Sequence, residues 1–288
     1  METILLSEIL SFCGGISRNL SGDRPVSYIS TDSRDIKPGS VFVAVQGEIF
    51  DGHRFVVSAI AQGAVCAIVN KVEEEYAHLP LIVVKDTMQA HIDIGAGYRA
   101  RFSPKIVGVT GSVGKTTTKD MVAAVLSRKY RTLKTQGNFN NEIGLPKTLF
   151  AMSREHQAAV IEMGMSARGE IEVLSKAVRP DMAGITNIGV SHLQNLGTRE
   201  NILAAKLEIL SGLKEGGPLL LNMDNDLLRT VGADIYKNIC FYAAENHNAD
   251  YYAKDIRENI YETTFTICHG KEEIPAKIPC IGRHNVQN

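Results

Sequence analysis

The chain has 288 residues, of which 44% are hydrophobic and 22% are charged, and its formal net charge is −1. This length gives room for about two globular domains, and the composition is that of a folded protein. A net charge so close to zero argues against broad electrostatic attraction to nucleic acid or to an anionic membrane, so any recognition of phosphate must be local.

Nothing in the sequence directs the chain to a membrane or to an oxidising compartment. The N-terminal METILLSEIL lacks a basic segment, Glu8 interrupts its apolar run, and no stretch reaches the roughly 18 apolar residues that span a bilayer. The five cysteines form no CxxC pair, which is typical of free thiols. We therefore expect a soluble cytoplasmic protein.

The first part of the chain predicts a small α/β domain. Its candidate strands are VFVAV at 41–45, VCAIV at 65–69 and LIVV at 81–84. A helical stretch from about Met88 to Arg101 leads to Pro104, which favours an extended chain before it. We place the boundary near Ser103, with one domain over residues 1–102 and a second over residues 103–288.

The second domain alternates predicted strands, turns and helices. Its candidate strands are the apolar runs at 106–110, 158–163, 183–188, 218–222 and 239–243. Runs of this length between helices favour a mostly parallel sheet with helices on both faces, in which ligands bind at the carboxyl ends of the strands. Residues 251–279 are more typical of extended segments or a hairpin, with a turn at His269-Gly270-Lys271.

The string VTGSVGKTTT at 109–118 contains a variant phosphate-binding loop. A buried strand is predicted to end at Thr110 and a helix to begin near Lys115, so the glycine-containing turn can present N–H groups to an anion at the positive end of the helix. Lys115 would neutralise phosphate and Thr116 would ligate Mg²⁺. A chance match is the alternative, and the strand-loop-helix context disfavours it. The expected nucleotide-binding residues here are Gly111, Ser112, Val113, Gly114, Lys115, Thr116 and Thr117.

Glu162 ends a predicted strand and is the candidate carboxylate for the same Mg²⁺ ion. The alternative is an ordinary exposed glutamate. A switch GTPase is disfavoured, because the only string similar to a guanine-reading segment, NKVE at 70–73, precedes the loop.

Lys206 falls in the middle of an apolar stripe in the helix predicted after Thr198. Two interpretations stay open. In the first, the aliphatic stem packs while the ammonium reaches water. In the second, burial lowers the pKa of the amine, which adds CO₂ and becomes a carbamate, an anion able to ligate a second Mg²⁺. His192 could ligate that ion, although a single histidine after a strand is more often structural.

Together, these residues resemble the Mur ligase superfamily, the ATP-dependent amide-forming enzymes of peptidoglycan precursor synthesis. The matching motifs are the TGxxGKT loop at 110–116, Glu162 in IEMG, Asn187 and His192 in NIGVSHL, Lys206 in AAKLEIL, and the terminal GRHNVQN. The strings at 30–55 and 137–149 resemble the branch that adds D-alanyl-D-alanine, and the first is partly shared with the branch that adds the third amino acid. Members of the superfamily continue beyond GRHNVQN into a C-terminal domain, so we expect this chain to be truncated.

The resemblance implies a ligase that uses ATP to join D-alanyl-D-alanine to UDP-N-acetylmuramoyl-tripeptide through an acyl phosphate. It implies two Mg²⁺ ions, one held by Thr116 and Glu162 and the other by His192 and carbamylated Lys206, with Lys115 as a further catalytic residue. The first domain would bind the UDP-linked substrate and the second would bind ATP, with Asn285 and Asn288 on the adenine side.

The resemblance also suggests residues for the UDP-linked substrate, for which turn formation is the competing explanation. These residues are Thr31, Asp32, Ser33, Arg34, Gln46, Gly47, Asn138, Asn140 and Asn141. We expect a monomer that binds neither nucleic acid nor a membrane.

Two other functions stay open. One is a sister ligase, either the enzyme that adds the third amino acid or one like folylpolyglutamate synthase, and GNFNNEIGLP at 137–146 weighs against both. The other is a nucleotide-binding module without catalytic activity, which would not need Glu162, His192 and Lys206 together.

Overall fold

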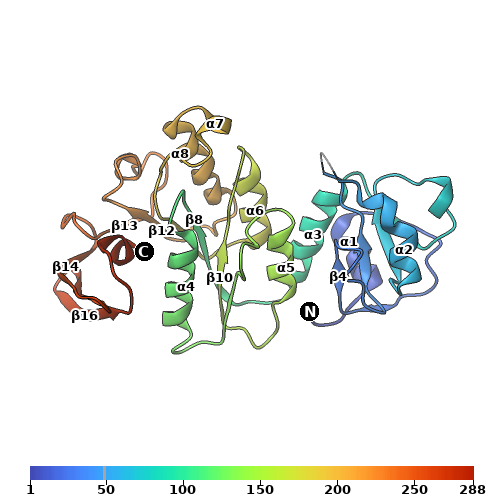
Figure 1. Ribbon diagram of the computed structural model, residues 1–288, viewed down its shortest axis with the longest axis horizontal. Helices are drawn as coiled ribbons and strands as arrows, with labels where there is room; N and C mark the ends of the chain where they lie inside the picture. Colours follow the sequence, from blue (N-terminus) through green and yellow to red (C-terminus); the bar gives the residue numbers. More distant parts are fainter. Residues whose placement is uncertain (48–49) are drawn as a thin grey trace. The chain divides into compact units, whose positions relative to one another are not determined.

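The computed structural model describes residues 1–47 and 50–288, which form two compact units (Figure 1). The first unit contains Met1–Ser103 and Glu142–Glu155, and the second contains Pro104–Asn141 and His156–Asn288. The chain first passes between the units at Ser103. The sequence analysis placed residues 142–155 in the second domain, whereas the structure includes them in the first unit.

The first unit is built on a five-stranded sheet with the order β2-β7-β6-β5-β4. Strands β4 to β7 run parallel, β2 is antiparallel to β7, and β1 pairs with β3. The strands are β1 (Ile4–Leu5), β2 (Ile16–Arg18), β3 (Pro25–Val26), β4 (Ile29–Ser30), β5 (Val41–Val43), β6 (Cys66–Val69) and β7 (Leu81–Val83). The helices are α1 (Leu6–Cys13), α2 (Val56–Ala61), α3 (Thr87–Arg99) and α5 (Gly144–Phe150), with 3₁₀ turns at Gly52–Phe55 and Glu74–Tyr76.

The apolar runs that predicted strands in this unit form β5, β6 and β7. Phe42, Val69 and Leu81 from these strands are buried in one core cluster with Val56 of α2. The prediction of a small α/β domain is thus confirmed, because the alternating side chains of a parallel sheet need helices to cover them.

Helices α3 and α5 pack against each other inside the first unit. The Tyr98 hydroxyl donates a 2.8 Å hydrogen bond to the Met152 carbonyl, and His91 Nε2 lies 3.3 Å from the Ile143 carbonyl oxygen. The side chain of Leu149 is fully buried. Burial of this apolar surface against α3 explains why residues 142–155 belong to the first unit, although they interrupt the sequence of the second.

The second unit contains a nine-stranded sheet with the order β16-β15-β14-β13-β12-β11-β8-β10-β9. Strands β8 to β14 are parallel, and β15 and β16 are antiparallel, so the prediction of a mostly parallel sheet is confirmed. The strands are β8 (Lys105–Thr110), β9 (Thr132–Lys134), β10 (Ala158–Glu162), β11 (Met182–Ile185), β12 (Leu219–Asn222), β13 (Ile239–Ala243), β14 (Tyr251–Glu258), β15 (Thr263–His269) and β16 (Glu272–Ile278).

The helices of the second unit connect these strands. They are α4 (Lys115–Leu126), α6 (Glu170–Val178), α7 (Leu193–Leu196), α8 (Arg199–Leu207) and α9 (Arg283–Gln287), with 3₁₀ turns at Glu208–Ser211 and Leu228–Thr230. Across the described parts of both units, we find no helix with the length and apolarity to cross a membrane.

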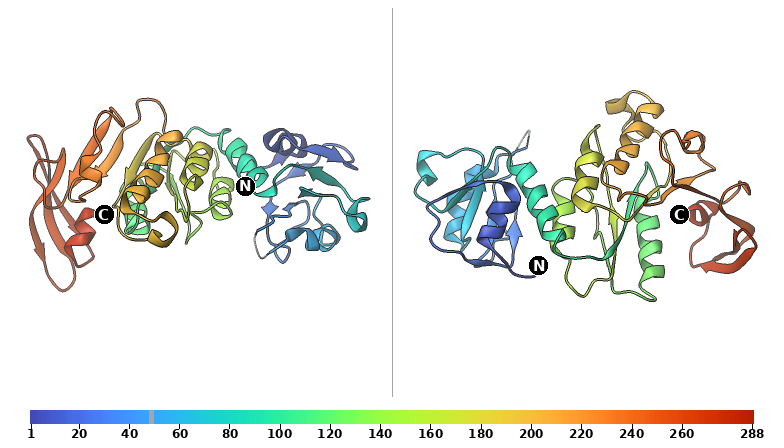
Figure 2. Two further views of the ribbon diagram at one scale, coloured as in Figure 1. Left: turned by 90° about the horizontal axis from the view of Figure 1, so that it is seen from above. Right: turned by 180° about the vertical axis from the view of Figure 1, so that it is seen from behind.

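The two faces of the nine-stranded sheet are covered by different helices, as Figure 2 allows the reader to follow from above and from behind. Val109 of β8 and Val160 of β10 form a core cluster with Ala123 of α4. On the other face, a Cβ at Gly108 would lie 3.3 Å from Pro180, which follows α6. Because successive residues of a strand point to opposite faces, α4 and the end of α6 lie on opposite sides of the sheet.

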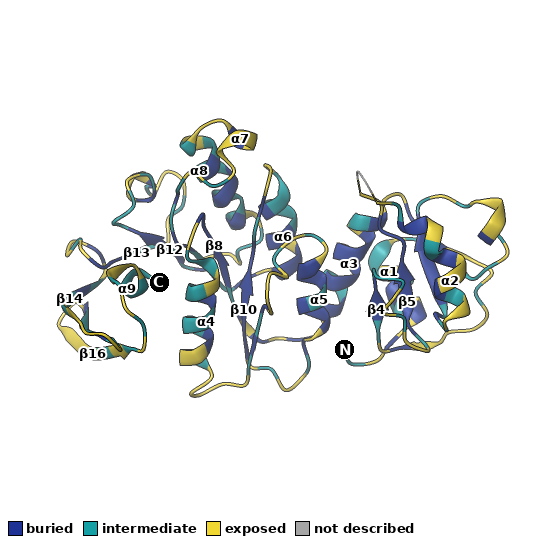
Figure 3. Ribbon diagram, in the orientation of Figure 1, coloured by how far each residue is buried: buried dark blue, intermediate teal, exposed yellow. Residues whose placement is uncertain are grey.

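Strands β8 and β10 are neighbours in the sheet, and the connections that follow them run in opposite directions across it. After β8 the chain passes beyond β10 to form β9, and after β10 it passes beyond β8 to form β11. Ligands of open α/β sheets bind in the crevice at such a point. Both strands lie in the interior, and β10 is buried along its whole length (Figure 3).

The segment at 251–279, predicted to be extended, forms β14, β15 and β16. The antiparallel strands β15 and β16 are joined at Gly270, whose φ of +56° is in the left-handed region that favours glycine. The predicted turn at 269–271 is confirmed.

His91 should make the first unit sensitive to acid. Burial lowers the pKa of its imidazole to about 4, from 6.5. The unfolded chain therefore binds this proton more readily, and stability that is complete above pH 6.5 is lost as the pH falls toward 4, by up to about 3 kcal/mol. We expect His91→Gln to flatten the pH dependence of the free energy of unfolding in this window, measured by urea denaturation. An equal pH dependence in both proteins would contradict this account.

Candidate nucleotide-binding site

The predicted phosphate-binding loop lies between β8 and α4, which begins at Lys115. Gly111 has φ +149° and Gly114 has φ +84°, a backbone region that residues with a Cβ rarely adopt. A Cβ on Gly111 would lie 1.9 Å from Thr186 Oγ1, and one on Gly114 would lie 2.3 Å from Asn288 Oδ1. Gly111 is therefore required by its backbone conformation and by space, whereas Gly114 is required by its conformation, and the buried Val109 is part of the strand that feeds the loop.

The segment that follows β11 holds the loop in place. The backbone N–H of Ser112 donates to the Asn187 carbonyl (3.0 Å), and that of Val113 donates to Asn187 Oδ1 (2.9 Å). The Thr186 hydroxyl donates to the Val113 carbonyl at 2.6 Å. In this structure the N–H groups of Ser112 and Val113 anchor the loop, and the expected binding of nucleotide by these two residues stays a prediction.

Glu162 is the centre of a buried polar cluster at the end of β10. The hydroxyl of Thr116 donates to its Oε2 (3.0 Å), and Nδ2 of Asn140 donates to its Oε1 (2.7 Å). The Glu162 N–H donates to the hydroxyl of Thr135 at 3.0 Å. With 1% of its surface exposed, Glu162 is not an ordinary surface glutamate, so that alternative is wrong. The side-chain oxygens of Glu162 and Thr116 next to a phosphate loop form a donor set that suits Mg²⁺.

Lys115 and Lys206 place two amines near each other at this site. Lys115 Nζ donates to the Gly111 carbonyl (2.9 Å), and burial lowers the pKa of Lys115 although the charge of Glu162 opposes the change. Lys206 is 1% exposed, so the interpretation in which its ammonium reaches water is wrong. Burial, together with the positive charge of Lys115, lowers the pKa of Lys206 to about 7.

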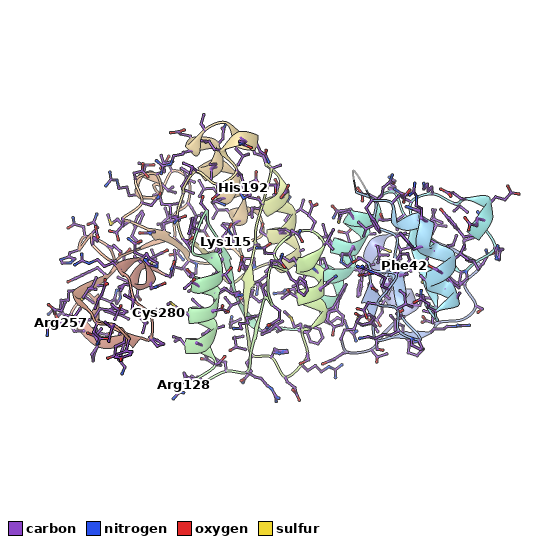
Figure 4. The ribbon with its side chains drawn as sticks, in the orientation of Figure 1. Phe42, Lys115, Arg128, His192, Arg257 and Cys280 are labelled. Carbon is purple, nitrogen blue, oxygen red and sulfur yellow. The ribbon has the colours of Figure 1, made fainter. Side chains whose placement is uncertain are left out.

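His192 does not share the burial of the Glu162 cluster. Its side chain is exposed, its φ is +64°, and it directly precedes the short helix α7. Figure 4 shows His192 and Lys115 toward the end of the sheet where β8 and β10 end. In residues 1–47 and 50–288, no group of three or more His, Cys, Asp or Glu side chains could hold a metal ion. A site made by His192 and a carbamylated Lys206 contains only one side chain of these types, so the expected second metal site stays a prediction.

The terminal asparagines lie in and beside α9. Asn285 Nδ2 donates to the Ile281 carbonyl (2.9 Å), and Asn288 Oδ1 accepts a 3.4 Å hydrogen bond from the Thr118 hydroxyl. Both asparagines line a largely apolar cavity of about 530 Å³ within the second unit. Val109, Met121 and Tyr242 also line it. An apolar cavity next to the phosphate loop has space for a planar base, and the adenine contacts stay a prediction.

The candidate substrate residues of the first unit follow two neighbouring parallel strands. Residues 31–34 come directly after β4, while Gln46 and Gly47 lie shortly after β5. Asp32 accepts hydrogen bonds from the backbone and the guanidinium of Arg34, which hold the pKa of Asp32 at about 2. This is the turn that the competing explanation proposed, and Arg34 is exposed.

Other predicted substrate residues belong to the second unit. Asn138 accepts a backbone hydrogen bond from Asn140 (2.7 Å), as expected of an asparagine-rich turn, and Asn141 ends this segment of the unit. The side-chain nitrogen of Asn140 is used by Glu162. Asn140 therefore belongs to the Glu162 cluster, its carbonyl also accepts a hydrogen bond from the Gly164 N–H (2.8 Å), and its contact with substrate stays a prediction.

The sequence analysis missed Lys119, whose side chain is buried beside Glu162 with Nζ 4.0 Å from Oε2. The signal was available. Lys119 precedes Ala123 by one helical turn, so it lies on the apolar face of α4, and the same pattern had drawn attention to Lys206.

Comparison with known proteins identifies the family. Residues 109–288 match the model of the Mur ligase middle domain, and residues 25–99 match that of the Mur ligase family catalytic domain. The chain belongs to the Mur ligase family. Its matched segments contain the loop, Glu162, Lys206 and the terminal motif.

Individual Mur ligases match over nearly the whole chain. The UDP-N-acetylmuramoyl-tripeptide–D-alanyl-D-alanine ligase of Bacillus subtilis is 44% identical over 90% of this chain and 56% of its own length. A crystal structure of MurF from Acinetobacter baumannii has a TM-score of 0.90 at 33% identity, covering 100% of this chain and 63% of that one. MurF from Thermotoga maritima in complex with ADP has a TM-score of 0.81 at 31% identity, over 90% and 61%. The chain thus spans less than two thirds of the length of these relatives.

Replacement of Gly111 by alanine should destabilise the second unit. The new methyl would collide with Thr186 at a backbone angle unfavourable for alanine, so we expect Gly111→Ala to lower the free energy of unfolding by about 1–3 kcal/mol. Gly184→Ala in β11 is the matched control, because a Cβ there meets no atom within 4 Å. Equal stability of the two variants in urea denaturation would contradict the geometry assigned to the loop.

Proposed function

We propose that this chain forms the substrate-binding and ATP-binding parts of a ligase that joins D-alanyl-D-alanine to UDP-N-acetylmuramoyl-tripeptide. The observation that carries the proposal is the Thr116–Glu162 pair between the phosphate loop and the end of β10, in a chain 44% identical to a ligase of that name. The reaction would occur in the cytoplasm, with the protein as a monomer. The first unit would bind the UDP-linked substrate through residues that follow β4 and β5.

The positive charges of the second unit support ATP as the co-substrate. A carboxylate and a polyphosphate repel each other, so their reaction needs cations fixed beforehand at the point where they meet. Lys115 lies on the loop at the N-terminus of α4, where the helix dipole also favours an anion. Its ammonium is bound by the Gly111 carbonyl, a weaker partner than phosphate, so we expect it to turn to the nucleotide. Asn285 and Asn288 would contact the adenine side.

Thr116 and Glu162 would hold the first Mg²⁺. Their oxygens are 3.0 Å apart, and both come from rigid elements that meet where β8 and β10 end. When bound, Mg²⁺ neutralises phosphate charge and orients the γ-phosphate toward the substrate carboxylate. Transfer of the γ-phosphate to that carboxylate would give an acyl phosphate and ADP. Attack by the amino group of D-alanyl-D-alanine then releases phosphate and forms the amide.

Lys206 would complete the site as a carbamate, together with His192 on a second Mg²⁺. Addition of CO₂ to the neutral amine forms the N–C bond and releases one proton. The lowered pKa leaves much of the amine neutral near pH 7, and the charge of the product is favourable: a carbamate would convert the repulsion between Lys206 and Lys115 into attraction. His192 is exposed and would ligate this ion from the solvent side of the site.

The substrate assignment predicts a strict requirement for the dipeptide. In the protein at its full natural length, release of phosphate from ATP with UDP-N-acetylmuramoyl-tripeptide should appear only when D-alanyl-D-alanine is added. Turnover measured by phosphate detection should be absent with single amino acids. Equal turnover with a single amino acid would favour the sister ligase that adds the third residue.

The carbamate assignment predicts loss of ligation in Lys206→Ala, with partial rescue by short carboxylic acids that restore a carboxylate in the vacated space. The control is Lys176→Ala, an exposed lysine paired with Glu172 on α6, which should keep full activity. A carbamate signal in ¹³C NMR with labelled bicarbonate should be present in the natural protein and absent from Lys206→Ala. Full activity of Lys206→Ala would refute the assignment.

A further inference from the structure

Lys119 is a buried lysine on the face of α4 that packs against the sheet. One helical turn later, Ala123 lies against Val160 of β10 in a core cluster. Glu162 follows Val160 by two residues, and side chains two apart on a strand point to the same face. Lys119 is one turn before Ala123 on α4, and Glu162 is two residues after Val160 on β10. The packing that brings Ala123 against Val160 therefore also brings Lys119 next to Glu162.

The ammonium of Lys119 lies between two carboxylates. Its Nζ is 4.0 Å from Glu162 Oε2 and 3.4 Å from Asp120 Oδ1. Asp120 Oδ1 is in turn 2.8 Å from Lys134 Nζ. The side chains of Lys134 and Asp120 are 39% and 46% exposed, whereas those of Lys119 and Glu162 are 3% and 2% exposed, so the row of alternating charges runs from the surface to the site.

Two groups of α4 contact the same oxygen of Glu162, Oε2. This oxygen accepts the Thr116 hydrogen bond and also faces Lys119, while Oε1 is occupied by Asn140. Lys115, one turn earlier on α4, directs its Nζ to the Gly111 carbonyl instead. Among the residues that the structure describes, Lys119 is the cation within ion-pair distance of Glu162. A buried carboxylate without a counter-ion is costly, so this pair fixes both the charge and the direction of Glu162.

We propose that Lys119 is a positioning residue and the buried counter-ion of Glu162, with its ammonium also paired to Asp120. It holds Oε2 toward Thr116 in the arrangement that Mg²⁺ requires, and it leaves Lys115 to the phosphates. Lys119 and Lys115, one helical turn apart, therefore have separate anionic partners: Glu162 for Lys119 and the nucleotide phosphates for Lys115. This inference rests on the proposed function for the presence of nucleotide and Mg²⁺.

A purely structural pair would have a different consequence. Loss of a buried partner destabilises the fold and weakens nucleotide binding to the same extent with and without Mg²⁺. Loss of a residue that orients a metal ligand acts on the metal-dependent part of binding, typically by 10–100-fold in metal affinity. The ratio of the ADP dissociation constants in EDTA and in Mg²⁺ separates these two effects.

We would measure this ratio by calorimetry in the protein at its full natural length. Lys119→Met should reduce the gain in ADP affinity from Mg²⁺ by on the order of tenfold or more. Lys119→Arg, which keeps the charge, should restore most of the gain. Lys105→Met is the matched control, because Lys105 is exposed and paired with Asp181 on the same sheet, and it should behave like the natural protein.

Three results would overturn the inference. They are an unchanged ratio in Lys119→Met, an equal loss of affinity with and without Mg²⁺, and a failure of Lys119→Arg to recover any of the gain. If Lys119→Met does not fold, Lys119→Gln is measured by the same criteria. If the natural protein binds ADP without any gain from Mg²⁺, the proposed first metal site fails as well, which distinguishes that failure from one confined to Lys119.

Discussion

The second unit depends on one buried carboxylate. Glu162 has almost no exposed surface, and a charge removed from water must be compensated by hydrogen bonds and by an opposite charge. The structure supplies the hydroxyl of Thr116, the amide of Asn140 and the ammonium of Lys119. Thr116 and Lys119 belong to α4, Asn140 lies in the segment after β9, and Glu162 itself ends β10. The contacts that compensate the charge of Glu162 therefore connect the helix after the phosphate loop to β10.

The same region contains more positive charge than the protein itself neutralises. Lys115 has a carbonyl as its hydrogen-bond partner, and Lys206 is buried close enough for Lys115 to lower its pKa. Two amines near each other in the interior repel, and an anion between them would remove the cost. In the proposed function, polyphosphate or a carbamate would supply that negative charge.

The phosphate loop follows β8, and the residues after β11, the neighbour of β8 on the side away from β10 and Glu162, hold it in place. Asn187 and Thr186 follow β11, the other neighbour of β8, and they bind the backbone of Ser112 and Val113. The loop is thus fixed between the ends of β10 and β11. Precise placement of α4 over Glu162 follows from this anchoring.

Local sequence determined the glycine loop and the parallel sheet and singled out Glu162 and Lys206, because glycine conformation, apolar periodicity and the position of a carboxylate after a strand are local properties. Tertiary structure decided the rest. Asn140 became a partner of Glu162, Ser112 and Val113 became anchors, and residues 142–155 joined the first unit by packing on α3. Lys119 acquired its role from the register of α4 on β10. Such contacts depend on which strands become neighbours in the sheet. In the sequence β9 follows β8, but in the sheet β10 lies next to β8, and the local sequence pattern does not show this.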